Sequence, residues 1–295
     1  MEEIDFLNKD SIEFMIISHP HLDHYSGILE ILDYVHSKNI IINNLCHSFG
    51  NLLGHLPYVE LDNSEDENGN TLLENIIEKI RLLDEVGLIK KRSGIGINTG
   101  FTLNSSFSLM AISPLDTEID VFNTQIELFK DKGDFVGCSK LANLLSTVWL
   151  LSFDRYCLLF TSDVTFETLD RIIERNSEIF RNKKLILGQM PHHGSKENHN
   201  IRFWKQWSFD VNSPIVVSAG QNLKYKHPHS RVIFDFDELN FKIHATNHVN
   251  GLIDFTDSDS FNIMDKFDLI SNEHHMDYLN GDQKFRIEKG FAITY

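Results

Sequence analysis

Cysteine, long apolar runs and positive charge are all scarce in this chain of 295 residues. The three cysteines are odd in number and widely spaced, which excludes a zinc site made of cysteines alone and disfavours a disulfide framework. We therefore expect buried thiols at Cys46, Cys138 and Cys157. No apolar run reaches the roughly 20 residues of a membrane-spanning helix, and the acidic start MEEIDF is unlike a signal peptide. These absences predict a soluble cytoplasmic protein with no membrane segment.

Basic residues are few overall but are concentrated in one segment. Lysine and arginine number 27 against 43 aspartates and glutamates, a net charge of -16, and such an average argues against a polyanionic partner. Residues 181–231 reverse the balance, with nine basic and two acidic residues and a local charge of +7. Two interpretations fit this excess of positive charge: a surface that binds a polyanion, or an ordinary solvated face.

Apolar residues are plentiful, at 41% of the chain with 22 phenylalanines, and they support a sizeable core in one large domain or two small ones. Their spacing predicts strands at 14–17, 40–45, 102–112, 143–153, 156–161, 184–190, 215–219, 241–246 and 251–255. It predicts helices at 27–36, 72–86, 169–180 and 201–207, a turn at 114–121 and a helical or irregular stretch to 132. The polar run 62–70 is expected to be a loop, and the acidic run 254–282 an exposed appendage with a last strand in 285–295.

Three histidines and an aspartate follow the first apolar run within six residues, in FMIISHPHLDHYSG. Because side chains alternate along a strand, His19 and His21 share one side. Asp23 follows them as long as the chain stays extended, while His24 turns toward a second position. Imidazole and carboxylate groups at this density are typical ligands of zinc or a similar divalent ion. The alternative is a histidine-rich surface loop.

The segment HPHLDH resembles the HxHxDH signature of the metallo-β-lactamase fold superfamily. Three later segments narrow the match: LLFTSD at 158–163 resembles the strand that delivers the superfamily's bridging aspartate, and GQMPHHGS at 188–195 and SAGQNLKYKHP at 218–228 resemble segments of the hydrolase domain of the competence protein ComEC. The resemblance spans about 14–253. It implies an α/β fold, the αββα sandwich of that superfamily, in a domain at 1–253 with a helical insertion at about 46–110, followed by the appendage at 254–295.

The resemblance also implies a site. Asp163 matches the aspartate that bridges two ions, with the N-cap of the next helix as the alternative reading. His193 matches a metal ligand, and His192 is its neighbour or an alternate ligand. The residues placed at the substrate are Ser195, Lys196, Asn222, Tyr225 and His227.

One expected histidine is missing. The superfamily usually supplies another ligand between the HxHxDH segment and the bridging aspartate, and the matching position here falls near Asn143 and Ser146. The first ion then has His19, His21 and Asp163. The second has Asp23, His24, Asp163 and His193. The resemblance thus implies one or two divalent ions, zinc or manganese.

Members of this superfamily normally begin with a pair of strands before the histidine motif, whereas about a dozen residues precede position 14 here. An uncovered sheet edge invites pairing with another chain. We therefore expect a shortened first sheet or strands supplied by a partner polypeptide, and association or low solubility when the chain is expressed alone.

Together these features predict a metal-dependent hydrolase, foremost a phosphodiesterase or nuclease that acts on DNA through a metal-activated water. In this interpretation Asp163 bridges the ions, Asp23 orients the water, and His227 with Lys196 steadies the phosphorane oxygens. One alternative is a hydrolase of a small acyl or lactam substrate, which the overall acidity favours. The other is a catalytically weak subunit that binds a partner, which the missing strands and the missing histidine favour.

Overall fold

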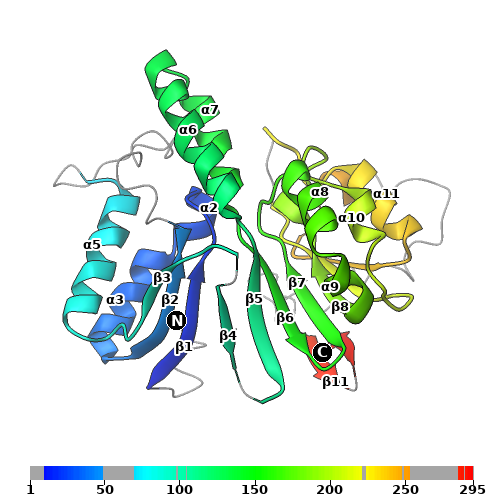
Figure 1. The fold of residues 1–295 in the computed structure, drawn as a ribbon, viewed down its shortest axis with the longest axis horizontal. Helices are drawn as coiled ribbons and strands as arrows, with labels where there is room; N and C mark the ends of the chain where they lie inside the picture. The colour runs from blue at the N-terminus through cyan, green and yellow to red at the C-terminus, as the bar shows by residue number, and fades with distance from the viewer. Residues whose placement is uncertain are drawn as a thin grey trace. The chain divides into compact units, whose positions relative to one another are not determined.

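The computed structural model describes residues 10–48, 70–97, 99–103, 105–220, 224–247, 249–252, 285–288 and 290–294. The chain forms two compact units (Figure 1). Unit 1 comprises Met1–Ile97 and Pro114–Ser146, and unit 2 comprises Asn98–Ser113 and Thr147–Tyr295. Each unit combines strands with helices, so the predicted α/β class is confirmed.

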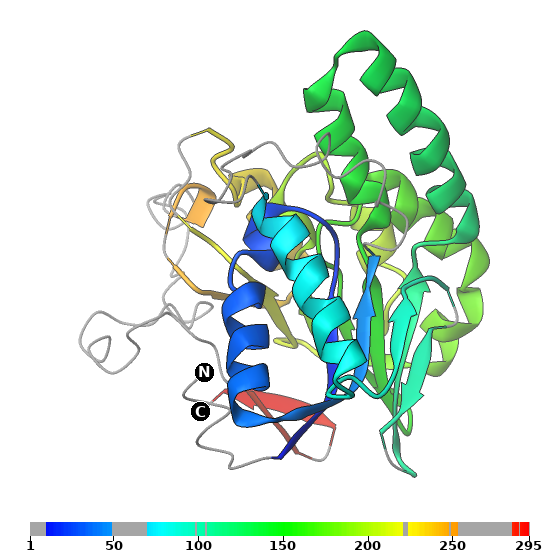
Figure 2. The same cartoon turned by 90° about the vertical axis from the view of Figure 1, so that its left-hand side faces the viewer.

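Unit 1 is built on a parallel sheet in the order β1-β2-β3. These strands are β1 (Ser11–Ile17), β2 (Ile41–His47) and β3 (Arg92–Gly94). Parallel neighbours need a crossover, which α3 (Ile28–Lys38) and α5 (Leu72–Glu85) provide. The two helices lie side by side against the sheet (Figure 2). Among the described residues β1 is an edge strand, so the strand expected from a partner stays a prediction.

The apolar stripe of the predicted helix 72–86 points into the core of unit 1, as expected. Its first turn is closed by a capping box. The Glu74 N–H donates to the Thr71 hydroxyl at 3.3 Å, and the Thr71 N–H donates to the Glu74 carboxylate at 2.8 Å. Two N–H groups that the helix itself leaves unbonded are satisfied in this way.

Replacing Thr71 with alanine is expected to lower the free energy of unfolding by about 1 kcal/mol, because one of those N–H groups loses its acceptor. Urea denaturation followed by circular dichroism measures the change. Thr124→Ala is the matched control, since among the described residues that exposed hydroxyl bonds only to the Asp120 carbonyl within its own helix. Equal midpoints for the two variants would contradict the assigned role of the cap.

The rest of unit 1 departs from the sequence prediction in two places. Helix α6 (Asp116–Lys132) occupies most of the predicted turn at 114–121, because the buried Glu118 carboxylate accepts the Leu115 N–H at 2.8 Å and closes its first turn. Helix α7 (Phe135–Leu141) and the 3-10 turn η2 (Ala142–Leu145) follow. The strand predicted from 143 therefore begins only at Val148.

Unit 2 contains a sheet in the order β10-β9-β8-β7-β6-β5-β4. Strands β4 to β7 pair antiparallel and β7 to β10 pair parallel. The tight connection at Asp154, with φ 48°, joins β6 to β7 as the predicted hairpin. The strands are β4 (Gly100–Thr102), β5 (Phe107–Ser113), β6 (Val148–Phe153), β7 (Tyr156–Phe160), β8 (Lys184–Gln189), β9 (Pro214–Val217) and β10 (Lys242–Ala245).

Helices cover one face of this sheet. They are α8 (Phe166–Arg175), α9 (Ser177–Asn182), α10 (Ile201–Trp204) and α11 (Ser230–Glu238). Trp204 and Trp207 are buried among them, so the prediction that these aromatic residues belong to the core is confirmed.

Part of the other face is covered by the hairpin of β11 (Phe285–Glu288) and β12 (Phe291–Thr294). Residues that alternate along β7 show the division, because Leu158 packs toward the hairpin whereas Leu159 packs toward the helices. The last strand expected in 285–295 is thus present, as one half of this hairpin pair.

Three sequence predictions are wrong in part, fall outside the described residues or differ from the structure. Gly251 and Leu252 are helical, so the strand predicted there is wrong for these two residues. The acidic run 254–282 and most of the loop 62–70 lie outside the described residues, and the domain boundary at 253 stays a prediction. The range 46–110, expected as an insertion, contributes α5 and β3 to unit 1 and β4 to unit 2.

The three cysteines are buried and free, as predicted. Among the described helices none combines the length and the apolar character that a membrane crossing requires.

Candidate functional site

The first histidine cluster follows β1 in unit 1 and comprises His19, His21, Asp23 and His24. The strand ends at Ile17, and the chain does not stay extended through Asp23 as the alternation argument assumed. Instead His21 is the N-cap of a single helical turn, α2 (Leu22–Tyr25). This turn places Asp23 in its exposed first positions.

Hydrogen bonds in this cluster determine which nitrogen of the His21 ring carries the hydrogen. The His21 Nε2 lies 2.9 Å from the Ser139 carbonyl oxygen, which can only accept. Nε2 therefore carries the hydrogen, and in the neutral ring the Nδ1 of His21 keeps a lone pair. That Nδ1 lies 3.1 Å from Nε2 of the fully buried His19. Two nitrogens that bind one tetrahedral zinc ion at about 2.1 Å each lie about 3.4 Å apart, so this spacing is close to that of two ligands of a shared cation.

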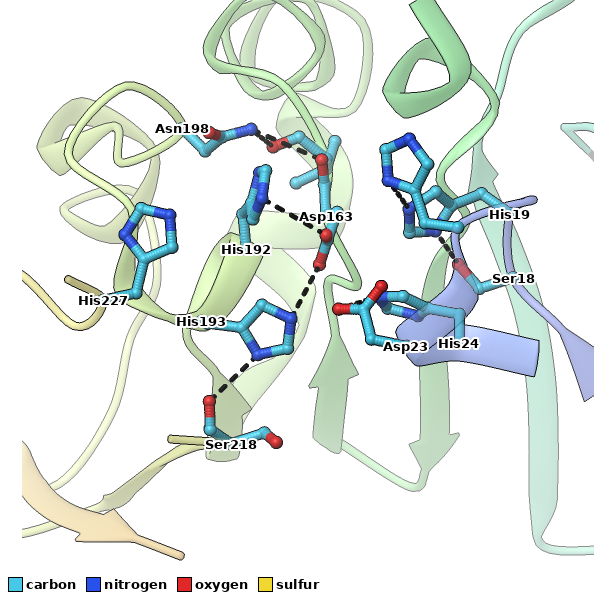
Figure 3. A network of polar contacts seen from close by, with 12 residues as sticks. Ser18, His19, Asp23, His24, Asp163, His192, His193, Asn198, Ser218 and His227 are labelled. Carbon is cyan, nitrogen blue, oxygen red and sulfur yellow. Dashed lines mark hydrogen bonds and ion pairs between the residues drawn. The ribbon is translucent and has the colours of Figure 1, made fainter. Parts of the chain in front are cut away.

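The rings of His19 and His24 also meet, with centroids 4.1 Å apart, and the outer Nδ1 of His19 lies 3.2 Å from the Ser18 hydroxyl. Histidines that bind metals usually engage their second nitrogen in this way, which orients the ring. Figure 3 shows these side chains.

The second cluster lies in unit 2 and centres on Asp163, whose side chain is only 4% exposed. It is not the N-cap of α8, since Thr165 holds that position and accepts the Thr168 N–H. The Asp163 Oδ2 lies 3.5 Å from His192 Nε2, and its Oδ1 lies 3.9 Å from His193 Nε2 (Figure 3). A buried carboxylate that faces two imidazoles is a donor set for a cation.

The ring of His193 has the same arrangement as that of His21. Its Nδ1 lies 3.0 Å from the Ser218 carbonyl oxygen, so Nδ1 carries a hydrogen. In the neutral ring Nε2 is then an acceptor that points at a carboxylate, which is also an acceptor. Two acceptors face each other stably only with a proton or a metal ion between them.

His192 and His193 have unusual backbones, with φ of 45° and 56° inside the turn η3 (Pro191–Gly194). Left-handed conformations cost about 1–2 kcal/mol for residues other than glycine, and two in succession are rare. Hydrogen bonds maintain the turn, because the His192 N–H donates to the Ser162 carbonyl and the Ser195 N–H donates to the His192 carbonyl, both at 2.9 Å. Strain held in this way concentrates at functional sites.

His227 lies beside His192, with ring centroids 5.4 Å apart (Figure 3). Burial, followed by the nearby His192 and His229, lowers the pKa of His227 to about 4, so the ring is neutral at pH 7. Tyr225 is 50% exposed and stacks on His227 at 5.9 Å, with Lys224 Nζ 4.7 Å from its ring centre.

The remaining residues expected at the substrate are placed differently. Ser195 is buried, whereas Lys196 is exposed with its Nζ 3.9 Å from a Glu197 oxygen. Asn222 lies outside the described residues. The position expected for the missing ligand falls near Asn143 and Ser146 in unit 1, where the Asn143 Oδ1 is buried and has no hydrogen-bond partner in the described part of the chain.

The basic segment 181–231 is less positive in space than in sequence. Lys184 pairs with Asp210 at 2.7 Å within the segment. Arg202 pairs with Asp170 at 3.4 Å and Arg231 with Asp235 at 2.7 Å, and both of these aspartates come from outside it. These pairs weaken the argument for a continuous basic face.

Several residues that shape the site were not predicted. The Asn198 amide donates to the Val164 carbonyl at 3.0 Å and to the Asp163 carbonyl at 3.4 Å. The carbonyls of Ser139 and Ser218 orient two histidines. Every residue has a backbone carbonyl, so the sequence could not have identified these two. His229 is different, because its place two residues after His227 could have drawn attention to it.

The histidine and aspartate groups of these clusters can hold a metal ion, which is the donor chemistry that the sequence predicts. A scan against family models and a search of curated proteins find no match for this chain.

Proposed function

We propose that this chain is a metal-dependent hydrolase of the metallo-β-lactamase fold superfamily, and that its substrate is a phosphodiester, with DNA the foremost candidate. One observation carries the proposal. His21 and His193 both donate their outer N–H to a backbone carbonyl, which leaves the inner nitrogen of each ring as an acceptor beside another potential ligand. This pattern is typical of metal-binding histidines.

The ligands are assigned by the resemblance and supported by the donor chemistry. We propose that the donors for the one or two ions that the resemblance implies are His19, His21, Asp23 and His24 of unit 1 and Asp163 and His193 of unit 2, with His192 as an alternate ligand. Zinc and manganese both accept such nitrogen and oxygen donors. A bound ion of this kind polarises a phosphoryl oxygen and lowers the pKa of water at the site.

The chain's own side chains supply the remaining roles. The Asp23 carboxylate is exposed at the start of α2, where it can accept a hydrogen bond from the attacking water and orient it. Lys196 is exposed on the loop after His193 and can bind a non-bridging phosphate oxygen. The exposed ring of Tyr225 offers a surface for a base or sugar.

A small acyl or lactam substrate is the second candidate. The ion pairs of Lys184, Arg202 and Arg231 favour it, because they remove charge that a long polyanion would use.

The decisive experiment combines metal content with turnover. The purified chain is dialysed against zinc or manganese, its metal content is measured by mass spectrometry, and it is then assayed on single-stranded DNA, double-stranded DNA and a β-lactam, with and without chelator. We expect one or two ions per chain and chelator-sensitive cleavage of DNA. Lactam turnover without DNA cleavage would select the second candidate, and a chain that retains no metal would overturn both.

A further inference from the structure

His227 and His229 form a direct hydrogen bond in unit 2. Their Nδ1 atoms lie 3.1 Å apart, so one ring must donate and the other accept. The backbone N–H of Lys196 shows which ring is the acceptor, because it donates to the Nδ1 of His229 at 3.3 Å. A ring nitrogen that accepts carries no hydrogen. His229 Nδ1 is therefore the acceptor in both contacts, and the hydrogen lies on Nδ1 of His227.

This assignment determines the protonation of Nε2, the other nitrogen of the His227 ring. In a neutral imidazole only one nitrogen is protonated, so Nε2 of His227 holds a lone pair. We propose that His229 is a positioning residue, which keeps His227 in the Nδ1–H tautomer and so makes the His227 Nε2 a proton acceptor beside the Asp163 cluster. The role predicted for His227 from the sequence, steadying the phosphorane oxygens, would instead need a hydrogen on Nε2.

The backbone around His229 is held from both sides. Its N–H donates to the Gly194 carbonyl at 3.0 Å, and the neighbouring Pro228 carbonyl accepts the Gly251 N–H at 2.9 Å. The Asn250 amide also donates to the His227 carbonyl. His229 is the N-cap residue of α11, and its carbonyl accepts the Val232 N–H at 2.9 Å. The acceptor atom is thus anchored to the same loop that carries His192 and His193.

What the acceptor does rests on the proposed function. During hydrolysis a bond forms between the water oxygen and phosphorus, and the bond from phosphorus to the leaving oxygen breaks. His227 Nε2 takes a proton from the water and returns it to the leaving oxygen, so the ring is neutral again at the end of the cycle.

The tautomer can be measured without metal or substrate. The chain is labelled with ¹⁵N-histidine, stripped of metal and studied above pH 7 by long-range proton–nitrogen correlation spectra, with His227→Gln used to assign the signals. We expect His227 to show a protonated Nδ1 and a bare Nε2. We expect His229→Leu to lose this preference, and His229→Asn to retain it, because the asparagine Oδ1 takes the place of Nδ1 and accepts both N–H groups.

Turnover gives the second readout. His229→Leu should lower kcat about 10- to 100-fold with little change in KM, and His229→Asn should recover most of the loss. A hydrogen on Nε2 of wild-type His227 would overturn the inference even if the leucine variant failed to fold, and so would an unchanged tautomer in a folded His229→Leu. A chain with the expected tautomer and no hydrolytic activity would instead count against the proposed function alone.

Discussion

Replacing Asp163 with asparagine is expected to reduce metal-dependent cleavage about 1,000-fold and to lower the metal content of the purified chain. The carboxylate is buried, and its two oxygens face His192 Nε2 at 3.5 Å and His193 Nε2 at 3.9 Å. Asparagine keeps the shape but removes the charge, and it replaces one acceptor oxygen with an NH₂ donor. Loss of about 4 kcal/mol of transition-state stabilisation corresponds to the expected factor.

The same variant should fold. The volume is conserved, and the Asn198 amide bonds to the backbone carbonyl of residue 163, which the substitution leaves in place. Circular dichroism and urea midpoints of the metal-free chain test this. Asp154→Asn is the matched control, since it makes the same chemical change in the exposed β6–β7 turn, where φ is 48° and asparagine is well tolerated. Wild-type metal content and rate in Asp163→Asn would contradict the assigned role.

Replacing Gly194 with alanine is expected to lower the free energy of unfolding by about 3 kcal/mol and to disturb metal binding as well. The residue has φ +80°, and a Cβ atom there would lie 2.5 Å from Pro228 Cβ. The left-handed backbone contributes about 1–2 kcal/mol and the collision about 1–3 kcal/mol. Because Gly194 follows His193 and accepts the His229 N–H, any shift that relieves the collision moves both histidines.

Guanidinium denaturation measures the loss of unfolding free energy. Alanine substitutions at two other glycines separate the backbone contribution from that of the collision. Gly87 has φ +75°, and an added Cβ would meet no atom of the described residues within 4 Å, so Gly87→Ala isolates the backbone contribution. Gly27 also has open space and no positive φ, so Gly27→Ala should change stability little. If Gly194→Ala were no less stable than Gly87→Ala, the close approach to Pro228 would have no energetic consequence.

Local periodicity was enough to predict much of the fold. Helix α5 and the β6–β7 hairpin were found because spacing and turn position are properties of neighbouring residues. Helix α6 begins earlier than predicted because the Glu118 carboxylate reaches back to the Leu115 N–H, a contact that the apolar pattern does not reveal. The division into two units was also beyond reach, since it depends on which segments pack together.

For the site, residue types could be predicted but not their orientations. The motifs identified Asp163, His192 and His193, yet the two left-handed backbones that orient the histidines lie in a turn held by a hydrogen bond to the Ser162 carbonyl, 30 residues earlier in the chain. Counting charges along 181–231 overstated its positive character, because Asp170 and Asp235 lie outside that range and neutralise two of its arginines. Sequence neighbours alone do not define an electrostatic surface.

The β11–β12 hairpin has a consequence for anyone who shortens or tags this protein. Phe285, Ile287 and Ala292 shield Leu158, Ile186 and Leu187 of the sheet. A truncation that ends before 285 would leave those apolar side chains open to water, a surface that favours aggregation. Purification tags belong at the other terminus.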